Sequence, residues 1–222
     1  MRVRRLVMLR HGQTEFNAAN RMQGQLDSQL SELGREQAMA AAEVLAKFDP
    51  LLIVSSDLHR AYDTAVALGR RIGSRVVVDE RLRETHLGSW QGMTHSEVDA
   101  SAPGARIAWR NDATWAPHGG ESRVDVARRS LPLVAELVES QHDWGADEPY
   151  RPVVLVAHGG VIAALTAKLL DLPVESWPVL GGMGNASWVQ LSGHSAERAG
   201  LGQISWRLDV WNASAQVAGD VL

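Results

Sequence analysis

Uninterrupted apolar runs recur along this chain, and each one ends where polar residues begin. The runs that predict strands cover residues 6–9, 51–55, 75–79 and 152–157. An apolar run without polar alternation is typical of a parallel strand that is covered on both faces. Two later segments, 187–191 and 204–211, flank a glycine-rich loop and predict a further pair of strands. The pattern therefore predicts one sheet of mostly parallel strands.

Segments of helical periodicity lie between these strands. We predict four helices, over residues 32–47, 58–72, 123–140 and 161–170. Ser31 suits the N-cap of the first, and Leu33 is expected on its apolar face. Gly73 is expected to close the second, because glycine adopts the left-handed conformation common just after a helix. Strands and helices thus alternate at the spacing of crossover units.

The regular pattern breaks down between Glu84 and Ser122, where glycine, proline, tryptophan and charged residues gather. We interpret residues 85–122 as an insertion that forms a substrate lid. Residues 141–151 are interpreted as a polar linker, and residues 214–222 as a frayed tail. The whole chain is expected to form a single domain, an α/β three-layer sandwich with a mostly parallel central sheet.

Composition narrows the function classes. A chain of 222 residues, 45% hydrophobic, is long enough for one sizeable core. The net charge of −4 provides no basic field for nucleic acid or an anionic membrane. The absence of cysteine excludes disulfides, thiolate catalysis and thiolate metal sites. No apolar stretch approaches the ~20 residues that a membrane span needs. The apolar run after the basic N-terminus is too short for a signal peptide, and Arg10-His11 interrupts it. We expect a cytoplasmic protein without nucleic-acid or membrane partners.

Polar side chains follow the four parallel strands at the points where the strands end. They are Arg10, His11, Arg60, Glu84 and His158. Because ligands of open α/β sheets bind beyond the carboxyl ends of the strands, we expect these side chains to line one pocket. Two arginines, two histidines and a carboxylate in one pocket favour phosphoryl transfer through a phosphohistidine.

Each candidate has a chemical role in such a reaction. The two arginines match a phosphate dianion, and their charge keeps a neighbouring imidazole neutral, so that a ring nitrogen of His11 can attack phosphorus. Glu84 can protonate the leaving alkoxide and then, as a carboxylate, deprotonate the attacking water. His158 and the backbone N–H of Gly159 are expected to donate to the phosphate oxygens. Glu80 is the alternative acid.

These motifs resemble the histidine phosphatase superfamily, whose fold is also called phosphoglycerate mutase-like. The resemblance covers residues 3–211 and rests on Leu9-Arg10-His11-Gly12-Gln13-Thr14, Leu30-Ser31-Glu32-Leu33-Gly34, Ser55-Ser56 with Arg60, Trp90-Gln91-Gly92, Gly119-Gly120-Glu121-Ser122 and Ala157-His158-Gly159-Gly160. It implies that His11 is phosphorylated, that Glu84 is the proton donor and that Arg10, Arg60 and His158 complete the phosphate pocket. The candidate substrate-binding residues are Asn17, Gln23, Gly24, Gly159 and Trp115.

Comparison within the superfamily favours hydrolysis. The branch of acid phosphatases and phytases takes its proton donor from a late His-Asp pair, and His142-Asp143 of this chain lies in the polar linker. The bisphosphoglycerate-dependent mutases carry a longer insertion and a basic clamp, which are absent between Glu84 and Glu121. We predict a phosphatase for a small phosphorylated metabolite. The alternatives are mutase-type phosphoryl transfer, a phosphatase of broad specificity, and a phosphate-binding module without turnover.

Aromatic and basic side chains in and next to the insertion are further candidates for substrate contact. Trp115, or alternatively Trp109, is a candidate to stack on a sugar ring. Arg106, Arg110 and Arg123 are candidates to hold a substrate carboxylate. No metal-ligand spacing such as His-Glu-x-x-His is present, so we expect neither a metal nor a cofactor. Apolar residues near the last predicted strands serve either the core or a dimer, and a homodimer is expected.

Overall fold

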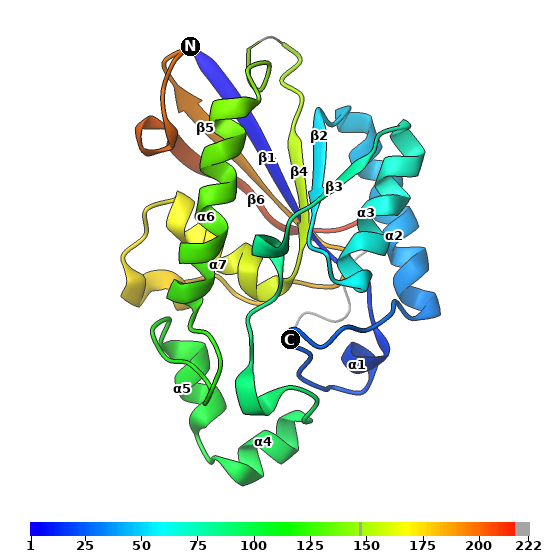
Figure 1. Ribbon diagram of the computed structural model, residues 1–222, viewed down its shortest axis with the longest axis vertical. Coiled ribbons are helices and arrows are strands. Elements are labelled where there is room, and N and C mark those ends of the chain that lie inside the picture. The colour runs from blue at the N-terminus through cyan, green and yellow to red at the C-terminus, as the bar shows by residue number, and fades with distance from the viewer. Residues whose placement is uncertain (147, 216–222) are drawn as a thin grey trace.

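The computed structural model describes residues 1–146 and 148–215 (Figure 1). Within these residues the strands form one six-stranded sheet in the order β3-β2-β4-β1-β5-β6. Strands β1 to β4 are parallel to one another, and β5 and β6 are antiparallel to their neighbours. Their bounds are β1 Arg2–Arg10, β2 Leu52–Ser55, β3 Val76–Val78, β4 Val153–Ala157, β5 Trp188–Ser195 and β6 Ser205–Ala213. The predicted, mostly parallel sheet is confirmed.

Helices cover both faces of the sheet and complete a three-layer sandwich (Figure 1). The alternating residues of β1 divide between two cores, with Val7 and Leu9 in one and Leu6 and Met8 in the other. Helices α2 (Glu32–Leu45) and α3 (His59–Ile72) pack over the first core, and α6 (Arg123–Ser140) and α7 (Gly159–Leu169) over the second. The predicted α/β sandwich is therefore confirmed.

Caps fix the ends of these helices much as the sequence predicts. The Ser31 hydroxyl accepts a hydrogen bond from the Gly34 N–H at 3.0 Å, and α3 ends at Gly73 with φ +69°. The expectation that Leu33 faces the core is wrong, since its side chain is 45% exposed. Gly34 takes the buried position of that first turn, where a Cβ would lie 1.9 Å from the Gln13 carbonyl oxygen. This contact fixes the loop after β1 against α2.

The insertion lies beyond the carboxyl ends of the parallel strands (Figure 1). It contains two short helices, α4 (His95–Ser101) and α5 (Ala105–Asn111), which the sequence pattern does not predict. Helices of this length are too short for periodicity to reveal. They surround a small apolar cluster built on Met22, Leu87, Trp90 and Val98, separate from the two main cores. Its role as a substrate lid stays a prediction.

Short elements make up most of the remaining regular structure. They are α1 (Glu15–Ala18) and the 3-10 turns η1 (Ala46–Phe48), η2 (Glu80–Leu82), η3 (Gly88–Trp90), η4 (Val174–Val179) and η5 (Leu201–Gln203). Strand β5 continues to Ser195, four residues beyond the predicted end at Leu191. Of the predicted frayed tail, residues 216–222 lie outside the described part of the chain. Among the described helices, none is long and apolar enough to cross a membrane.

The apolar side chains of the edge strand β6 pack inward. Trp206, Leu208 and Trp211 are half-buried against the core beneath α6 and α7. These residues therefore serve the core, and the expected homodimer stays a prediction.

Candidate active site

A cavity of about 140 Å³ lies where the parallel strands end, between the sheet and the insertion. The predicted site residues that line it are Arg10, His11, Asn17, Gln23, Gly24, Arg60 and Glu84. Arg21, Thr85, Leu87, Trp109 and Gly160 complete the lining. The structure thus brings to one place side chains that are widely separated in the sequence.

His11 is held on both sides by the backbone. Its N–H donates to the Ala157 carbonyl at 3.0 Å, and its carbonyl accepts from the Ala186 N–H at 3.0 Å. The imidazole Nδ1 lies 2.7 Å from the Gly12 carbonyl oxygen, which can only accept, so Nδ1 carries the proton. The lone pair is therefore on Nε2. Burial, followed by the charges of Arg60 and Arg10, lowers the pKa of His11 well below its usual value, so the ring is neutral at pH 7.

His158 lies beside His11, at the end of β4. It is fully buried, and its Nε2 lies 3.0 Å from the Ser56 hydroxyl. Its Nδ1 is buried and has no hydrogen-bond partner among the described residues. Burial is the main cause that lowers the pKa of His158 well below its usual value, and the Arg60 charge adds to it. A buried polar atom without a partner is costly, which is a reason to expect a ligand at this edge.

Arg60 is a fully buried cation at the start of α3. Its guanidinium donates to the carbonyl oxygens of Leu26 at 2.8 Å and Gly24 at 2.7 Å. Burial lowers the pKa of Arg60 to about 10, so it remains charged at pH 7. Thr64 links this helix to the nucleophile loop, because its hydroxyl donates to the Arg60 carbonyl at 2.7 Å and accepts from the Gly12 N–H at 3.1 Å. A buried threonine thus fixes Arg60 and His11 relative to each other.

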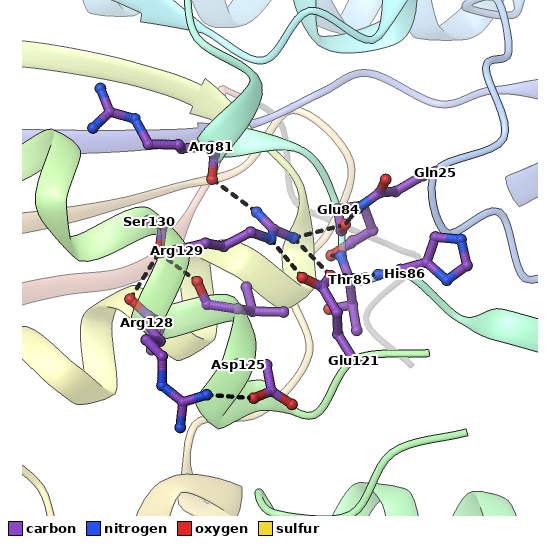
Figure 2. Close-up of polar contacts among 12 residues, drawn as sticks. Gln25, Arg81, Glu84, Thr85, His86, Glu121, Asp125, Arg128, Arg129 and Ser130 are labelled. Atoms are coloured by element: carbon purple, nitrogen blue, oxygen red, sulfur yellow. Dashed lines mark hydrogen bonds and ion pairs between the residues drawn. The ribbon is translucent and has the colours of Figure 1, made fainter. Parts of the chain in front are cut away.

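The Glu84 carboxylate reaches the cavity from the segment after η2. It accepts hydrogen bonds from the Thr85 N–H at 2.7 Å and the Gly160 N–H at 3.2 Å. A side chain at Gly160 would displace this carboxylate, since a Cβ there would lie 2.4 Å from Glu84 Oε1. The Glu84 carbonyl accepts from Gln25 at 3.0 Å and from Arg129 at 2.9 Å (Figure 2).

Two amide side chains line the cavity with their oxygen atoms already engaged. Asn17 Oδ1 accepts from the Thr14 N–H at 3.1 Å and from Asn185 Nδ2 at 3.2 Å. Gln23 Oε1 accepts from the Ser28 hydroxyl at 2.7 Å. Their NH₂ groups remain as donors toward an anion.

Two more arginines line the cavity. One is Arg21, whose guanidinium donates to the Gly92 carbonyl at 2.7 Å. The other is Arg10, at the end of β1. Its guanidinium donates to the Met183 carbonyl oxygen, which fixes it at the cavity wall. Gly159 lies next to the Arg10 side chain, since a Cβ at Gly159 would be 3.7 Å from Arg10 Nε. The cavity is thus lined by three guanidinium groups, the neutral imidazole of His11 and one carboxylate, and the His158 ring lies against His11.

Some of the residues that the sequence suggests for the site lie elsewhere. Trp115 stacks on Trp90, with ring centroids 5.3 Å apart, and Trp109 lines the cavity in its place. Glu80, the alternative acid, is mostly exposed at 77%. The carbonyl of His142 accepts a hydrogen bond from Arg2, at the opposite end of β1 from the cavity. The structure thus separates both alternative proton donors from the cavity.

Several functional candidates have no distinctive signal in the sequence. Arg129 lies within the long helix α6, and Asn185 lies in the segment before β5. Gly160 belongs to a motif, but nothing in the sequence indicates that its missing side chain makes room for Glu84. In the described part of the chain, no group of three or more His, Cys, Asp or Glu residues is placed to hold a metal ion.

Known proteins resemble this chain along its whole length. Residues 6–202 match the histidine phosphatase superfamily (branch 1). Glucosyl-3-phosphoglycerate phosphatase from Mycolicibacterium vanbaalenii is 76% identical, and that from Mycobacterium tuberculosis is 75% identical, each over the full length of both chains. A solved structure of the mycobacterial glucosyl-3-phosphoglycerate phosphatase with inorganic phosphate is 74% identical and superposes with a TM-score of 0.90, covering 96% of this chain and 99% of that one. This chain therefore belongs to the histidine phosphatase superfamily, and it is a phosphatase.

Proposed function

We propose that this phosphatase hydrolyses glucosyl-3-phosphoglycerate to glucosylglycerate and phosphate, through a phosphohistidine at His11. The observation that carries the mechanism is the buried, neutral His11, whose Nδ1 is engaged by the Gly12 carbonyl so that Nε2 is the nucleophilic nitrogen. The substrate is proposed from the two relatives of that activity, which share about three quarters of their residues with this chain over the full length.

In the first step, the Nε2 lone pair of His11 attacks the phosphorus atom. The N–P bond forms as the bond from phosphorus to the substrate oxygen breaks, and the Glu84 carboxyl group gives its proton to the leaving oxygen. Arg10 and Arg60 balance the charge of the phosphoryl oxygens.

In the second step, the Glu84 carboxylate takes a proton from a water molecule. The water oxygen bonds to phosphorus, the N–P bond breaks, and its electron pair returns to Nε2 of His11. Inorganic phosphate leaves, and Glu84 holds the proton for the next cycle. The buried Nδ1 of His158 faces no described partner, and we propose that it interacts with a phosphoryl oxygen during both steps.

The wall of the cavity made by the insertion supports a sugar-bearing leaving group. Trp109 lies in that wall, and its indole Nε1 is buried without a hydrogen-bond partner among the described residues. We propose that this N–H and the indole face contact the substrate. Arg123 lies over the same ring, with Cζ 6.0 Å from the ring centroid, and we propose that it holds the substrate carboxylate. Of the other two candidates, Arg106 is already engaged by Asp99 at 2.8 Å and Arg110 is exposed.

The test is phosphate release without added metal from glucosyl-3-phosphoglycerate, 3-phosphoglycerate, a sugar phosphate and an aryl phosphate. We expect the wild type to be fastest on the glucosylated substrate and His11→Ala to release none. Equal rates on all four substrates would contradict the substrate assignment. Phosphate release that survives His11→Ala would contradict the mechanism, and isomerised product without phosphate would identify a mutase.

We also propose that the protein is a cytoplasmic homodimer. The cytoplasmic proposal rests on the cysteine-free composition, and the homodimer on what the family resemblance implies. Sedimentation equilibrium tests the homodimer, and a monomer mass across the concentration range would contradict it.

A further inference from the structure

We propose that Arg129 is a positioning residue that holds the proposed general acid, Glu84, at the reacting phosphoryl group. This inference rests on the role proposed above for Glu84. Arg129 does not line the cavity and comes from the middle of α6, so its action on the reaction is indirect.

The Arg129 guanidinium distributes its hydrogen bonds over the segment that carries Glu84 (Figure 2). Nη1 donates to the Arg81 carbonyl at 2.8 Å, and Nη2 donates to the Glu84 carbonyl at 2.9 Å. Nε and Nη2 also donate to the two carboxylate oxygens of Glu121, at 2.7 and 3.0 Å. One planar cation thus ties the backbone three residues before Glu84 to the backbone of Glu84 itself.

Glu121 holds the backbone on the C-terminal side of Glu84. Its carboxylate accepts from the His86 N–H at 2.8 Å, and its own N–H donates to the His86 carbonyl at 2.8 Å. The Arg129–Glu121 pair therefore fixes the chain on both sides of Glu84, at Arg81 and at His86. Both partners are mostly buried, with side chains 23% exposed, so solvent screens the pair only in part.

This arrangement makes the direction of the Glu84 side chain depend on α6. The Glu84 carboxylate fits against Gly160 so closely that a Cβ there would lie 2.4 Å from it. A shift of the Glu84 backbone therefore cannot be absorbed by turning the side chain toward α7. Lysine can replace arginine only in part, because a single ammonium group does not provide this planar fork of donors.

The test uses the leaving group, because an acid matters only when the departing oxygen needs a proton. For 4-nitrophenyl phosphate the leaving group departs without one, whereas an alkyl phosphate requires it. We compare kcat/KM on both substrates, since this parameter reports the steps up to the first departure. Glu84→Gln is the reference variant, with an expected loss of about 100-fold or more on the alkyl phosphate and a much smaller loss on the nitrophenyl ester.

Arg129→Met is expected to give the same selective loss in milder form, about 10- to 100-fold on the alkyl phosphate and less than about 3-fold on the nitrophenyl ester. Arg129→Lys is expected to recover only part of the loss. Glu121→Gln, which keeps a side chain of the same size, should show the same selectivity, so the test remains informative if Arg129→Met folds poorly.

Arg128→Met is the matched control, because Arg128 is the neighbouring arginine on α6 and pairs with Asp125 at the exposed surface. It should leave both rates unchanged. Equal losses on both substrates in Arg129→Met and Glu121→Gln, with the selective loss preserved in Glu84→Gln, would overturn the role of Arg129 and leave the proposed function intact. Equal losses on both substrates in Glu84→Gln would overturn the acid role of Glu84 and, with it, this inference.

Discussion

The imidazole rings of His11 and His158 lie 5.1 Å apart between centroids, with their planes inclined by 60°. Both rings are buried, and Arg60 contributes a positive charge to the surroundings of each. A proton on either ring would add a further cation beside the buried Arg60. The pair is therefore neutral at pH 7, which suits the attack of His11 and makes the folded state sensitive to acid.

Acidification below pH 6.5 should destabilise the protein. In the unfolded chain each histidine binds a proton near pH 6.5, whereas the folded chain binds it only at a much lower pH, because the pKa of both His11 and His158 is lowered. Below pH 6.5 the unfolded state therefore binds more protons, and each histidine lowers the free energy of unfolding by up to about 1.4 kcal/mol per pH unit. Urea titrations at pH 7.5, 6.5 and 5.5 measure this loss.

His158→Asn should reduce the slope of stability against pH in that range, since one of the two histidines is removed. His59 is the control, because it is exposed and its hydrogen bond to Asp27 raises its pKa, giving a contribution of opposite sign. His59→Gln should not reduce the loss on acidification. A stability that stays constant from pH 7.5 to 5.5 would contradict this, because it would show that the folded chain takes up protons over the same pH range as the unfolded chain.

A methyl group added at Gly160 should impair catalysis more than folding. The Cβ of alanine would lie 2.4 Å from Glu84 Oε1 and 2.5 Å from the Thr85 hydroxyl, so the carboxylate must move. Gly160→Ala should lower kcat/KM on an alkyl phosphate by about 10- to 100-fold, the scale expected for a displaced catalytic group.

Gly159→Ala is the neighbouring comparison. Its Cβ would lie 3.7 Å from Arg10 Nε, an ordinary contact, and alanine favours the helical conformation. The loss should be smaller than in Gly160→Ala, and the melting temperature should not fall. Similar losses from the two alanines would argue against the close fit of Glu84 against α7.

Substitutions of two tryptophans in the insertion should have different effects, one on substrate recognition and the other on packing. Trp109 lines the cavity, and Trp109→Ala should raise KM for glucosyl-3-phosphoglycerate by about 10-fold, equivalent to about 1.4 kcal/mol, while it spares an aryl phosphate. Trp115 packs on Trp90, so Trp115→Ala should lower the melting temperature without a selective change in KM. A selective effect of Trp115→Ala alone would identify Trp115, rather than Trp109, as the residue that contacts the sugar.

Much of the sheet was predictable because its parallel strands are covered on both faces. A continuous apolar run such as 153–156 is typical of a strand that is buried on both faces. The helix caps at Ser31 and Gly73 were predictable because they depend on the residue type at a single position. The position of Leu33 was not predictable from periodicity. Gly34 approaches the loop after β1 closely, and this contact decides which side of the first turn of α2 is buried. The hydrophobic periodicity carries no information about it.

The site was predictable as a set of residues but not as a network. Strand ends place Arg10, His11 and His158 at one edge of any such sheet. The contacts that orient them involve carbonyl oxygens, such as that of Gly12 for His11, and side chains far along the chain, such as Arg129 for Glu84. These contacts depend on how the chain folds, so no local sequence pattern predicts them. The choice of Trp109 over Trp115 depends in the same way on how the insertion folds.

Trapping the phosphoenzyme tests the role of His11 as the nucleophile directly. Wild type and Glu84→Gln are mixed with 4-nitrophenyl phosphate and quenched in alkali, which preserves phosphohistidine, and the peptide containing His11 is examined by mass spectrometry. We predict phosphate on His11, attached at Nε2 and accumulating in Glu84→Gln, because the second step then lacks its base. Rapid turnover without any phosphorylated His11 peptide in either protein would contradict it.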